Sequence, residues 1–223
     1  MLEAIYLPKL NRLAPTLDST LLKAMEEAGE LARAVLQFMP WENLSPAELS
    51  VQPEAMARLA DVKEELLDVA QTCVTMIFVM EDLFGIEADS LICEHLKKLS
   101  DKGYGYDDSQ SYRIATVKNV RAGNFKSISL PRLKIEDVTL LTTVCKIQEE
   151  LGELTQFLGK HAGASGEQSR LDSEQVNRGA ALELLDVAQC CFTMMYILAE
   201  RHHVNIPELV DAHVDKLRVR GYC

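Results

Sequence analysis

Pairs of acidic residues recur at helical spacing in both halves of this 223-residue sequence. Glu27 and Glu30 are three residues apart, and so are Glu65 and Asp68, so each pair shares one face of a helix. The same two pairs return in the second half as Glu150 with Glu153 and Glu183 with Asp186. Carboxylates brought together by neighbouring helices are suitable ligands for a hard dication such as Mg²⁺, which binds through oxygen.

The residues around Glu65 and Asp68 predict that both carboxylates face other protein. The surrounding stretch, 66–77, is apolar on almost every side of a helix, and a helix of that kind is packed nearly all round. Unpaired carboxylates there would repel one another and would cost several kcal/mol of desolvation or take up protons. A bound dication removes both problems. A solvated Glu-x-x-Glu face is the alternative, but the repetition of all four acids favours a metal site.

The sequence repeats itself along most of its length. Residues 65–71 (ELLDVAQ) recur unchanged at 183–189, which is 118 positions later. Upstream, EEAGEL at 26–31 matches EELGEL at 149–154 with an offset of 123, so a loop in the second half is five residues shorter. This self-similarity predicts two tandem modules and a linker, with the boundaries 1–104, 105–127 and 128–223.

Each module is expected to contain three main helices, so the predicted fold class is all-α. Glycine and proline are few and clustered, which leaves long stretches suited to helices. The first helix, capped by Asp18 or Ser19, is expected to end near Phe38. The other helices are expected at about 54–84, 88–101, 136–160, 173–203 and 207–220, with stops at Gly85 and Gly103. The linker pattern predicts a β-hairpin over 112–130, with an irregular connection as the alternative.

Composition narrows the partners and the compartment. The 34 acidic residues against 23 basic ones give a formal net charge of −11, which argues against binding to nucleic acid or to an anionic membrane. The longest apolar stretch, 69–80, is too short to span a bilayer, and the N-terminal residues do not have the pattern of a signal peptide. Six cysteines without metal-ligand spacing predict reduced thiols and a cytoplasmic protein.

The order of the acidic motifs resembles a known signature. Glu-Glu-x-x-Glu followed downstream by Glu-x-x-Asp is similar to the motif of the all-α nucleoside triphosphate pyrophosphohydrolases, the superfamily of MazG and the dimeric dUTPases. The resemblance covers both halves. It implies that the eight acids named above bind Mg²⁺, or Mn²⁺, and that Glu26 and Glu149 are outer acids that could accept a proton from water. The implied reaction converts a nucleoside triphosphate and water into a nucleoside monophosphate and pyrophosphate, as in house-cleaning of the nucleotide pool.

Basic residues downstream extend the resemblance to the substrate. Family members often carry Asn-x-x-Lys-x-x-x-Arg on the following helix, where it contacts substrate. The matching frames here have His in place of Asn, and the first has Lys in place of Arg: His95, Lys98 and Lys102, then His213, Lys216 and Arg220. With Lys23 and Lys146, these residues are the expected substrate-binding groups. Basic residues that only cap helix C-termini are the alternative interpretation.

The resemblance also implies an assembly. Single-module relatives are similar to helical dimers, so two modules in one chain are expected to pack as an intramolecular pseudo-dimer with a core like a four-helix bundle. The apolar faces of 69–80 and 187–198 are the expected contact, and a further homodimer is compatible with it. Two rival functions stay open: a non-catalytic nucleotide- or metal-binding scaffold or sensor, and a di-iron site using Glu200 and His203. The di-iron site is disfavoured because the equivalent residues are Asp82 and Gly85.

Overall fold

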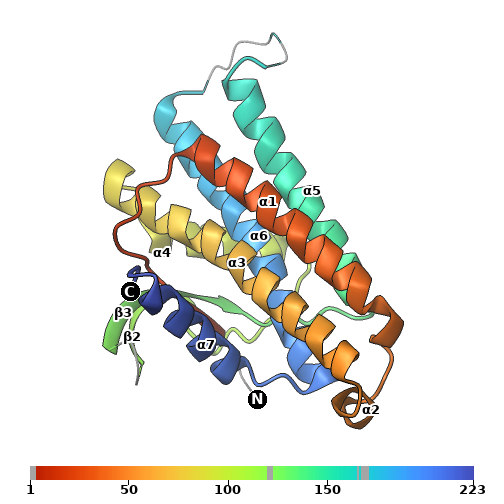
Figure 1. Ribbon diagram of the computed structural model, residues 1–223. Helices are drawn as coiled ribbons and strands as arrows, with labels where there is room; N and C mark the ends of the chain where they lie inside the picture. The colour runs from red at the N-terminus through yellow and green to blue at the C-terminus, as the bar shows by residue number, and fades with distance from the viewer. Residues whose placement is uncertain (1–3, 120–122, 165, 167–170) are drawn as a thin grey trace.

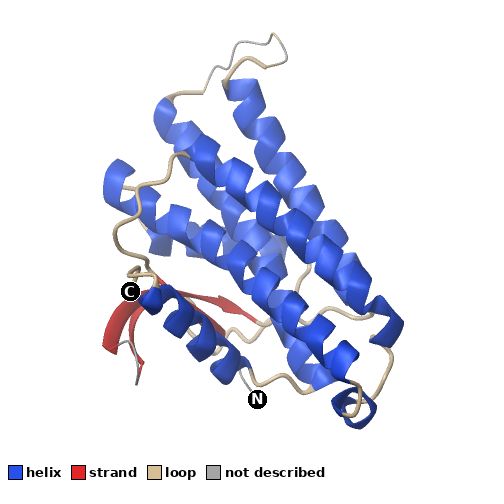
Figure 2. Cartoon of the chain, viewed as in Figure 1, coloured by secondary structure: helices blue, strands red, loops and turns tan. Residues whose placement is uncertain are grey.

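The computed structural model describes residues 4–119, 123–164, 166 and 171–223. The protein is mostly helical, with one small three-stranded sheet at its side (Figures 1 and 2). In chain order the elements are β1 (Ala4–Pro8), α1 (Leu17–Phe38), the 3₁₀ helix η1 (Met39–Trp41), α2 (Pro46–Ser50), α3 (Pro53–Phe84), α4 (Ala88–Asp101), β2 (Ile114–Asn119), β3 (Gly123–Pro131), α5 (Leu140–His161), α6 (Ser173–His202) and α7 (Ile206–Val219).

The four long helices form the body of the molecule. Helix α3 packs against α1 and α6, and α5 packs against α6 and α1, so that the four lie side by side (Figure 1). The contact between α3 and α6 is the one that the sequence predicts between the halves. The shorter helices cross over: α4, from the first half, packs on α6, and α7, from the second half, packs on α3.

The N-terminal ends of α1 and α5 differ from the positions that the sequence predicts. Thr16, and not Asp18 or Ser19, caps α1: its side chain accepts a hydrogen bond from the Ser19 backbone N–H, and the Thr16 backbone N–H donates one to Ser19 Oγ. Thr139 caps α5 in the same way, so that this helix begins at Leu140 and not near residue 136. The stops are as expected, because Gly85 and Gly103 adopt left-handed conformations with φ of 66° and 86°.

The sheet contains one strand, β1, that the sequence analysis did not predict. Strands β2 and β3 pair antiparallel as the predicted hairpin. Strand β1 pairs with the other edge of β3, placing Ile5 opposite Leu130 and Leu7 opposite Ile128. Because these segments are 123 residues apart in the repeat, β1 and β3 are equivalent strands that pair about the central Tyr6–Ser129 position.

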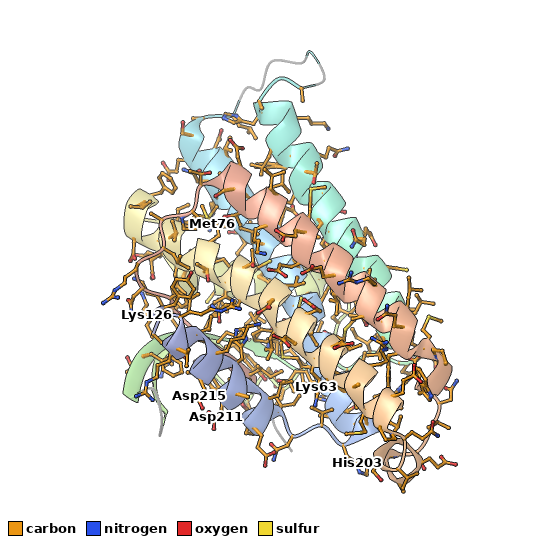
Figure 3. All side chains as sticks on the ribbon, in the orientation of Figure 1. Lys63, Met76, Lys126, His203, Asp211 and Asp215 are labelled. Atoms are coloured by element: carbon orange, nitrogen blue, oxygen red, sulfur yellow. The ribbon has the colours of Figure 1, made fainter. Side chains whose placement is uncertain are left out.

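The core lies between α3 and α6. Met76, which is labelled in Figure 3, is 1% exposed, and Phe78 and Phe192 are equally buried. Burial of each such side chain contributes roughly 1.5–3 kcal/mol. By length and composition α6 is apolar enough to cross a membrane, but 83% of its most apolar window is buried inside the protein, as in the core helix of a globular protein. This packing places the acidic residues of α3 beside those of α1, and the acidic residues of α6 beside Glu150 of α5.

Candidate metal and substrate sites

The first acidic cluster joins α1 to α3. Glu27, Glu30 and Glu65 each offer a carboxylate oxygen, and these oxygens lie within 4.8 Å of one another. Glu27 is buried, at 6% exposure, and the other two are half-buried. Asp68, the fourth expected ligand, lies outside this set of three, with its oxygens directed to side chains of α7.

The second cluster joins α5 to α6 in the equivalent place. It consists of Glu150, Glu183 and Asp186, again with oxygens within 4.8 Å of one another. Here the aspartate belongs to the cluster, and the acid outside the set of three is Glu153, which is exposed. Three of the four predicted acids thus come together in each half, but the triad is composed differently in the two halves.

A lysine from the same helix partly neutralises each cluster. Lys23 Nζ lies 2.6 Å from Glu27 Oε1 and 3.2 Å from Glu26 Oε2. Lys146 Nζ lies 2.7 Å from Glu150 Oε1 and 2.9 Å from Glu149 Oε1. The candidate proton acceptors Glu26 and Glu149 are each 58% exposed, at the edge of their clusters.

The downstream basic residues reach the acids of the opposite half. From α4, His95 and Lys98 both contact the carboxylate of Asp186 on α6. His95 Nδ1 lies 2.9 Å from Asp186 Oδ1. In the other direction, His213 and Lys216 of α7 face Asp68 on α3, with Lys216 Nζ at 2.8 Å from Asp68 Oδ2. Each site is thus assembled from both halves of the chain.

The last residues of the two basic frames lie at the C-terminal ends of their helices. Lys102 lines a cavity beside the second cluster. Arg220 forms the C-terminal cap of α7. Burial lowers the pKa of His213 to about 4; the charge of Asp68 opposes the shift, and the charges of Lys216 and Arg220 add to it.

Burial and mutual repulsion perturb the acids of both clusters. Burial, assisted by the charges of Asp186, Glu153 and Glu150, raises the pKa of Glu183 to about 7 despite the opposing charge of Lys98. Burial, with the charge of Glu30 next, also raises the pKa of Glu65. Both carboxyls are therefore less acidic than ordinary glutamates in the absence of a cation.

Two buried oxygens without a hydrogen-bond partner indicate whether a cation fits the second cluster. Among the described residues, Glu150 Oε2 and Glu183 Oε2 are buried atoms without a hydrogen-bond partner. A buried acceptor without a donor costs about 1–3 kcal/mol, and a charged one costs more. A cation between these oxygens would satisfy both, so the donor set fits a metal ion that prefers oxygen ligands.

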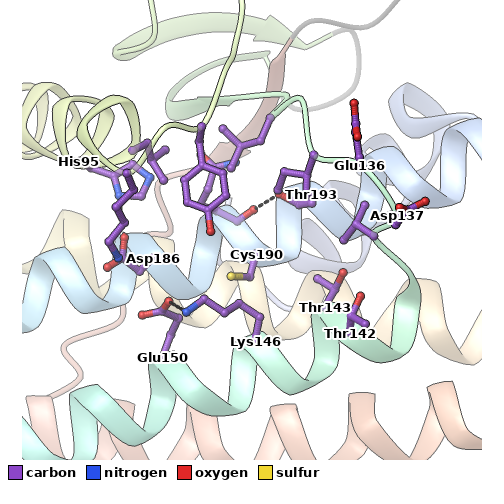
Figure 4. A pocket seen from close by; sticks show the side chains of 17 residues that line it. His95, Glu136, Asp137, Thr142, Thr143, Lys146, Glu150, Asp186, Cys190 and Thr193 are labelled. Carbon is purple, nitrogen blue, oxygen red and sulfur yellow. Dashed lines mark hydrogen bonds and ion pairs between the residues drawn. The ribbon is translucent and has the colours of Figure 1, made fainter.

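A cavity of about 320 Å³ adjoins the second cluster. Figure 4 shows Glu150, Lys146 and Asp186 gathered toward one side, with Thr142, Thr143 and Asp137 toward the other. Cys190 lies between these two groups, where the first half has Thr72. This volume is at the lower end of the range for small-molecule sites.

Two glutamines that sequence reasoning did not single out tie the acidic helices to the sheet. Gln71 Nε2 donates to the Pro8 carbonyl, and Gln189 Nε2 donates to the Pro131 carbonyl, both at 2.9 Å. The signal was present, because each glutamine ends the exactly repeated heptapeptide. Its meaning depends on the pairing of the predicted strand β3 with strand β1, which the sequence pattern did not reveal.

The residues proposed for a di-iron site do not come together. Glu200 forms an ion pair with Arg132. His203 is exposed in a left-handed conformation (φ 54°) after the end of α6, close to α2 (Figure 3). Neither residue belongs to an acidic or histidine cluster among the described parts of the chain.

Comparison with known proteins adds no relative to this description. No protein-family model, curated protein or solved structure matches the chain.

Proposed function

We propose that the protein is a Mg²⁺-dependent nucleoside triphosphate pyrophosphohydrolase, with Mn²⁺ as an alternative cation. The observation that carries the proposal is the pair of equivalent carboxylate clusters, in which Glu150 and Glu183 hold buried oxygens without a partner. Lysines and histidines from the opposite half adjoin each cluster, so cation-binding and phosphate-binding groups occur together.

The proposal includes a tandem MazG-like arrangement in which residues 1–104 and 128–223 form an intramolecular pseudo-dimer. Equivalent contacts support it, since both the glutamine–proline bonds and the histidine–aspartate contacts occur twice. All six cysteines are free, which agrees with a reducing compartment, and a cytoplasmic location is part of the proposal.

In the proposed reaction a water oxygen forms a new bond to phosphorus and the α–β phosphoanhydride bond breaks. Pyrophosphate leaves with the bonding electron pair, and the proton of the water passes to a carboxylate, for which Glu149 and Glu26 are the candidates. A divalent cation, when bound, neutralises phosphate charge and lowers the pKa of a water molecule. Lys98 and Lys102 in the second site, with Lys216 and Arg220 in the first, would orient the phosphates.

The experiment is an assay of pyrophosphate release from a panel of nucleoside triphosphates with Mg²⁺ or Mn²⁺. The double variant E65Q/E183Q should lose the metal-dependent turnover. The matched control is E54Q/E174Q, which removes one exposed first-turn glutamate from each of the same two helices. Undiminished turnover in E65Q/E183Q, or equal loss in the control, contradicts the proposal.

A non-catalytic nucleotide sensor is the competing function. Lysine ion pairs favour it, because Lys23 and Lys216 compensate Glu27 and Asp68 in the first site without a metal. Lys146 and Lys98 compensate Glu150 and Asp186 of the second site in the same way. A rise in melting temperature with Mg²⁺ and nucleotide, but without pyrophosphate release, is the outcome expected of a sensor.

A further inference from the structure

A second cavity, also of about 320 Å³, lies beside the first acidic cluster, between the C-terminal half of α1 and the N-terminal half of α3. Glu30 and Glu65, two members of the first carboxylate triad, line it together with two arginines, Arg33 and Arg58. Cation-binding and anion-binding side chains therefore share one cavity at the first site.

The two guanidinium groups lie near other residues of the lining. Arg33 Nη2 is 4.0 Å from Glu30 Oε1, which is too far for a hydrogen bond. Arg58 Nη1 is 3.2 Å from both Gln37 Oε1 and Asp61 Oδ2. Both contacts of Arg58 use Nη1, so its Nε and Nη2, like the guanidinium of Arg33, have N–H donors for a ligand. Arg33 is exposed and Arg58 is half-buried, so a ligand from solvent can reach both.

In the second half an aromatic ring takes the equivalent space. Ala34 and Asp61 of the first cavity correspond to Phe157 and Gly179. The Phe157 ring lies directly against Gly179, where it would clash with the Cβ of any other residue. The residues that correspond to the two arginines are uncharged: Gln156 and Val176. The combination of open space and guanidinium groups thus belongs to the first half.

The two carboxylate triads differ in the cavity that each one borders. The first triad contains Glu30, which lines the arginine cavity, and leaves out Asp68. The second contains Asp186, which lines the cavity described above, and leaves out Glu153, the counterpart of Glu30. A cation at the first triad would therefore border the arginines.

The charge of the lining suits an anion when a cation is present. Carboxylates outnumber guanidinium groups in the cavity, so the metal-free lining repels an anion. A divalent cation at the triad reverses that balance. Phosphate oxygens bind both Mg²⁺ and arginine, which donates to them in a planar, bidentate geometry.

We propose that this cavity binds a phosphate group, which bridges a divalent cation at the first cluster and the guanidinium groups of Arg33 and Arg58. The inference rests on the cation that the proposed function requires, and it adds a phosphate site that the second half does not share. Two sources have this chemistry: the terminal phosphates of a nucleoside triphosphate and free pyrophosphate.

The test measures binding by calorimetry in the E183Q protein, whose second cation site is impaired. The probes are inorganic pyrophosphate and an α,β-imido nucleoside triphosphate analogue, each with Mg²⁺. Adding R33Q/R58Q should weaken binding roughly tenfold for each guanidinium removed. The control K63Q/K160Q removes the same charge from α3 and α5 outside the cavity, and should leave binding unchanged.

A second variant fills the cavity and keeps both arginines. A34F/D61G introduces the residues of the second half. D61G removes a negative charge, so electrostatics alone would strengthen the binding of an anion, whereas loss of space should weaken it roughly tenfold or more. Titration with Mn²⁺, followed by electron paramagnetic resonance, checks the cluster itself. R33Q/R58Q should bind Mn²⁺ at least as tightly as before, because it removes positive charge beside the cation.

Arginine-dependent binding of pyrophosphate identifies the free anion as the ligand, and arginine-dependent binding of the nucleotide analogue alone identifies the phosphates of a substrate. Failure of both probes to bind, unchanged affinities in R33Q/R58Q, or equal losses in K63Q/K160Q overturn the inference. Arginine-dependent binding without pyrophosphate release from any natural triphosphate would refute the enzyme and leave the phosphate site. Pyrophosphate release with binding that ignores the arginines would do the reverse.

Discussion

The two acidic sites share one sequence frame and differ in how their aspartates are held. Asp186 is 7% exposed, lies 2.9 Å from His95 and belongs to the carboxylate triad of its site. Asp68 is more exposed, lies 3.7 Å from His213 and is outside the corresponding triad. Lys216 explains part of the difference, because it is shared between Asp68 and Glu64, whereas the counterpart of Glu64 in the second half is Leu182.

The comparison teaches that ligand type and spacing do not by themselves determine a site. The eight acids are conserved between the repeats, but neighbours such as Glu64 and Leu182, or Thr72 and Cys190, have diverged. In the second half the carboxylate triad is more buried, and unpartnered oxygens remain on Glu150 and Glu183. We therefore expect the second site to bind a divalent cation more tightly.

The largest expected effect concerns that difference in affinity. The substitution D186N should weaken Mn²⁺ binding at the second site by roughly 100-fold, because it removes a member of the triad. The equivalent D68N should have a much smaller effect, since Asp68 is directed to Lys216. Electron paramagnetic resonance titration of free Mn²⁺ measures both, with E54Q as the control. Equal losses would remove the distinction between the sites.

The next effect is on stability. The substitution K98A leaves the buried Asp186 without its lysine and should lower the free energy of unfolding of the metal-free protein by about 2 kcal/mol. The equivalent K216A should cost no more than about 1 kcal/mol, because Asp68 and Lys216 are each more than a fifth exposed. Urea denaturation in the presence of a chelator gives both values. A larger loss in K216A contradicts the ranking.

A smaller effect is expected in the pH dependence of the metal-free protein. The pKa of Glu183 is raised from 4.5 to about 7, so the folded state binds more protons than the unfolded state between these pH values. Stability should therefore decrease as pH rises from 4.5 to 7.5, by about 1 kcal/mol after allowance for the partial exposure of Glu183. Urea denaturation across this range should show a flatter profile for E183Q. If E183Q and the unsubstituted protein show the same pH dependence of stability, protonation of Glu183 is not its cause.

The smallest difference is expected where the two halves are alike. Q71L and Q189L each remove a bond of 2.9 Å to a proline carbonyl and should each cost about 1 kcal/mol of unfolding free energy, although Q71L also removes a longer bond of 3.2 Å to Thr75 Oγ1. The two losses should agree within about 0.5 kcal/mol, as measured by thermal unfolding. A large discrepancy would mean that the sheet supports only one of the sites.

Local patterns predicted the helices well and the strands incompletely. Periodicity and glycine stops located all the long helices, because those signals lie within a few residues of one another. The 3₁₀ helix and α2 were missed inside an expected loop, and strand β1 was missed because five residues form a strand only when β3 is beside them. The cap at Thr16 lies two residues before Asp18 and three before Ser19, the two expected caps, which is close to the usual uncertainty of a boundary.

The sequence by itself determined the duplication, the acid pairs and the helices that carry them, since each of these is encoded in spacing along one segment. The tertiary structure decided which half completes which site. Lys98 meets Asp186 across 88 positions and Lys216 meets Asp68 across 148. It also decided that the acids have different surroundings and that a cavity adjoins the second cluster. The physical reason is that burial and charge compensation depend on side chains brought together by packing, which no local periodicity specifies.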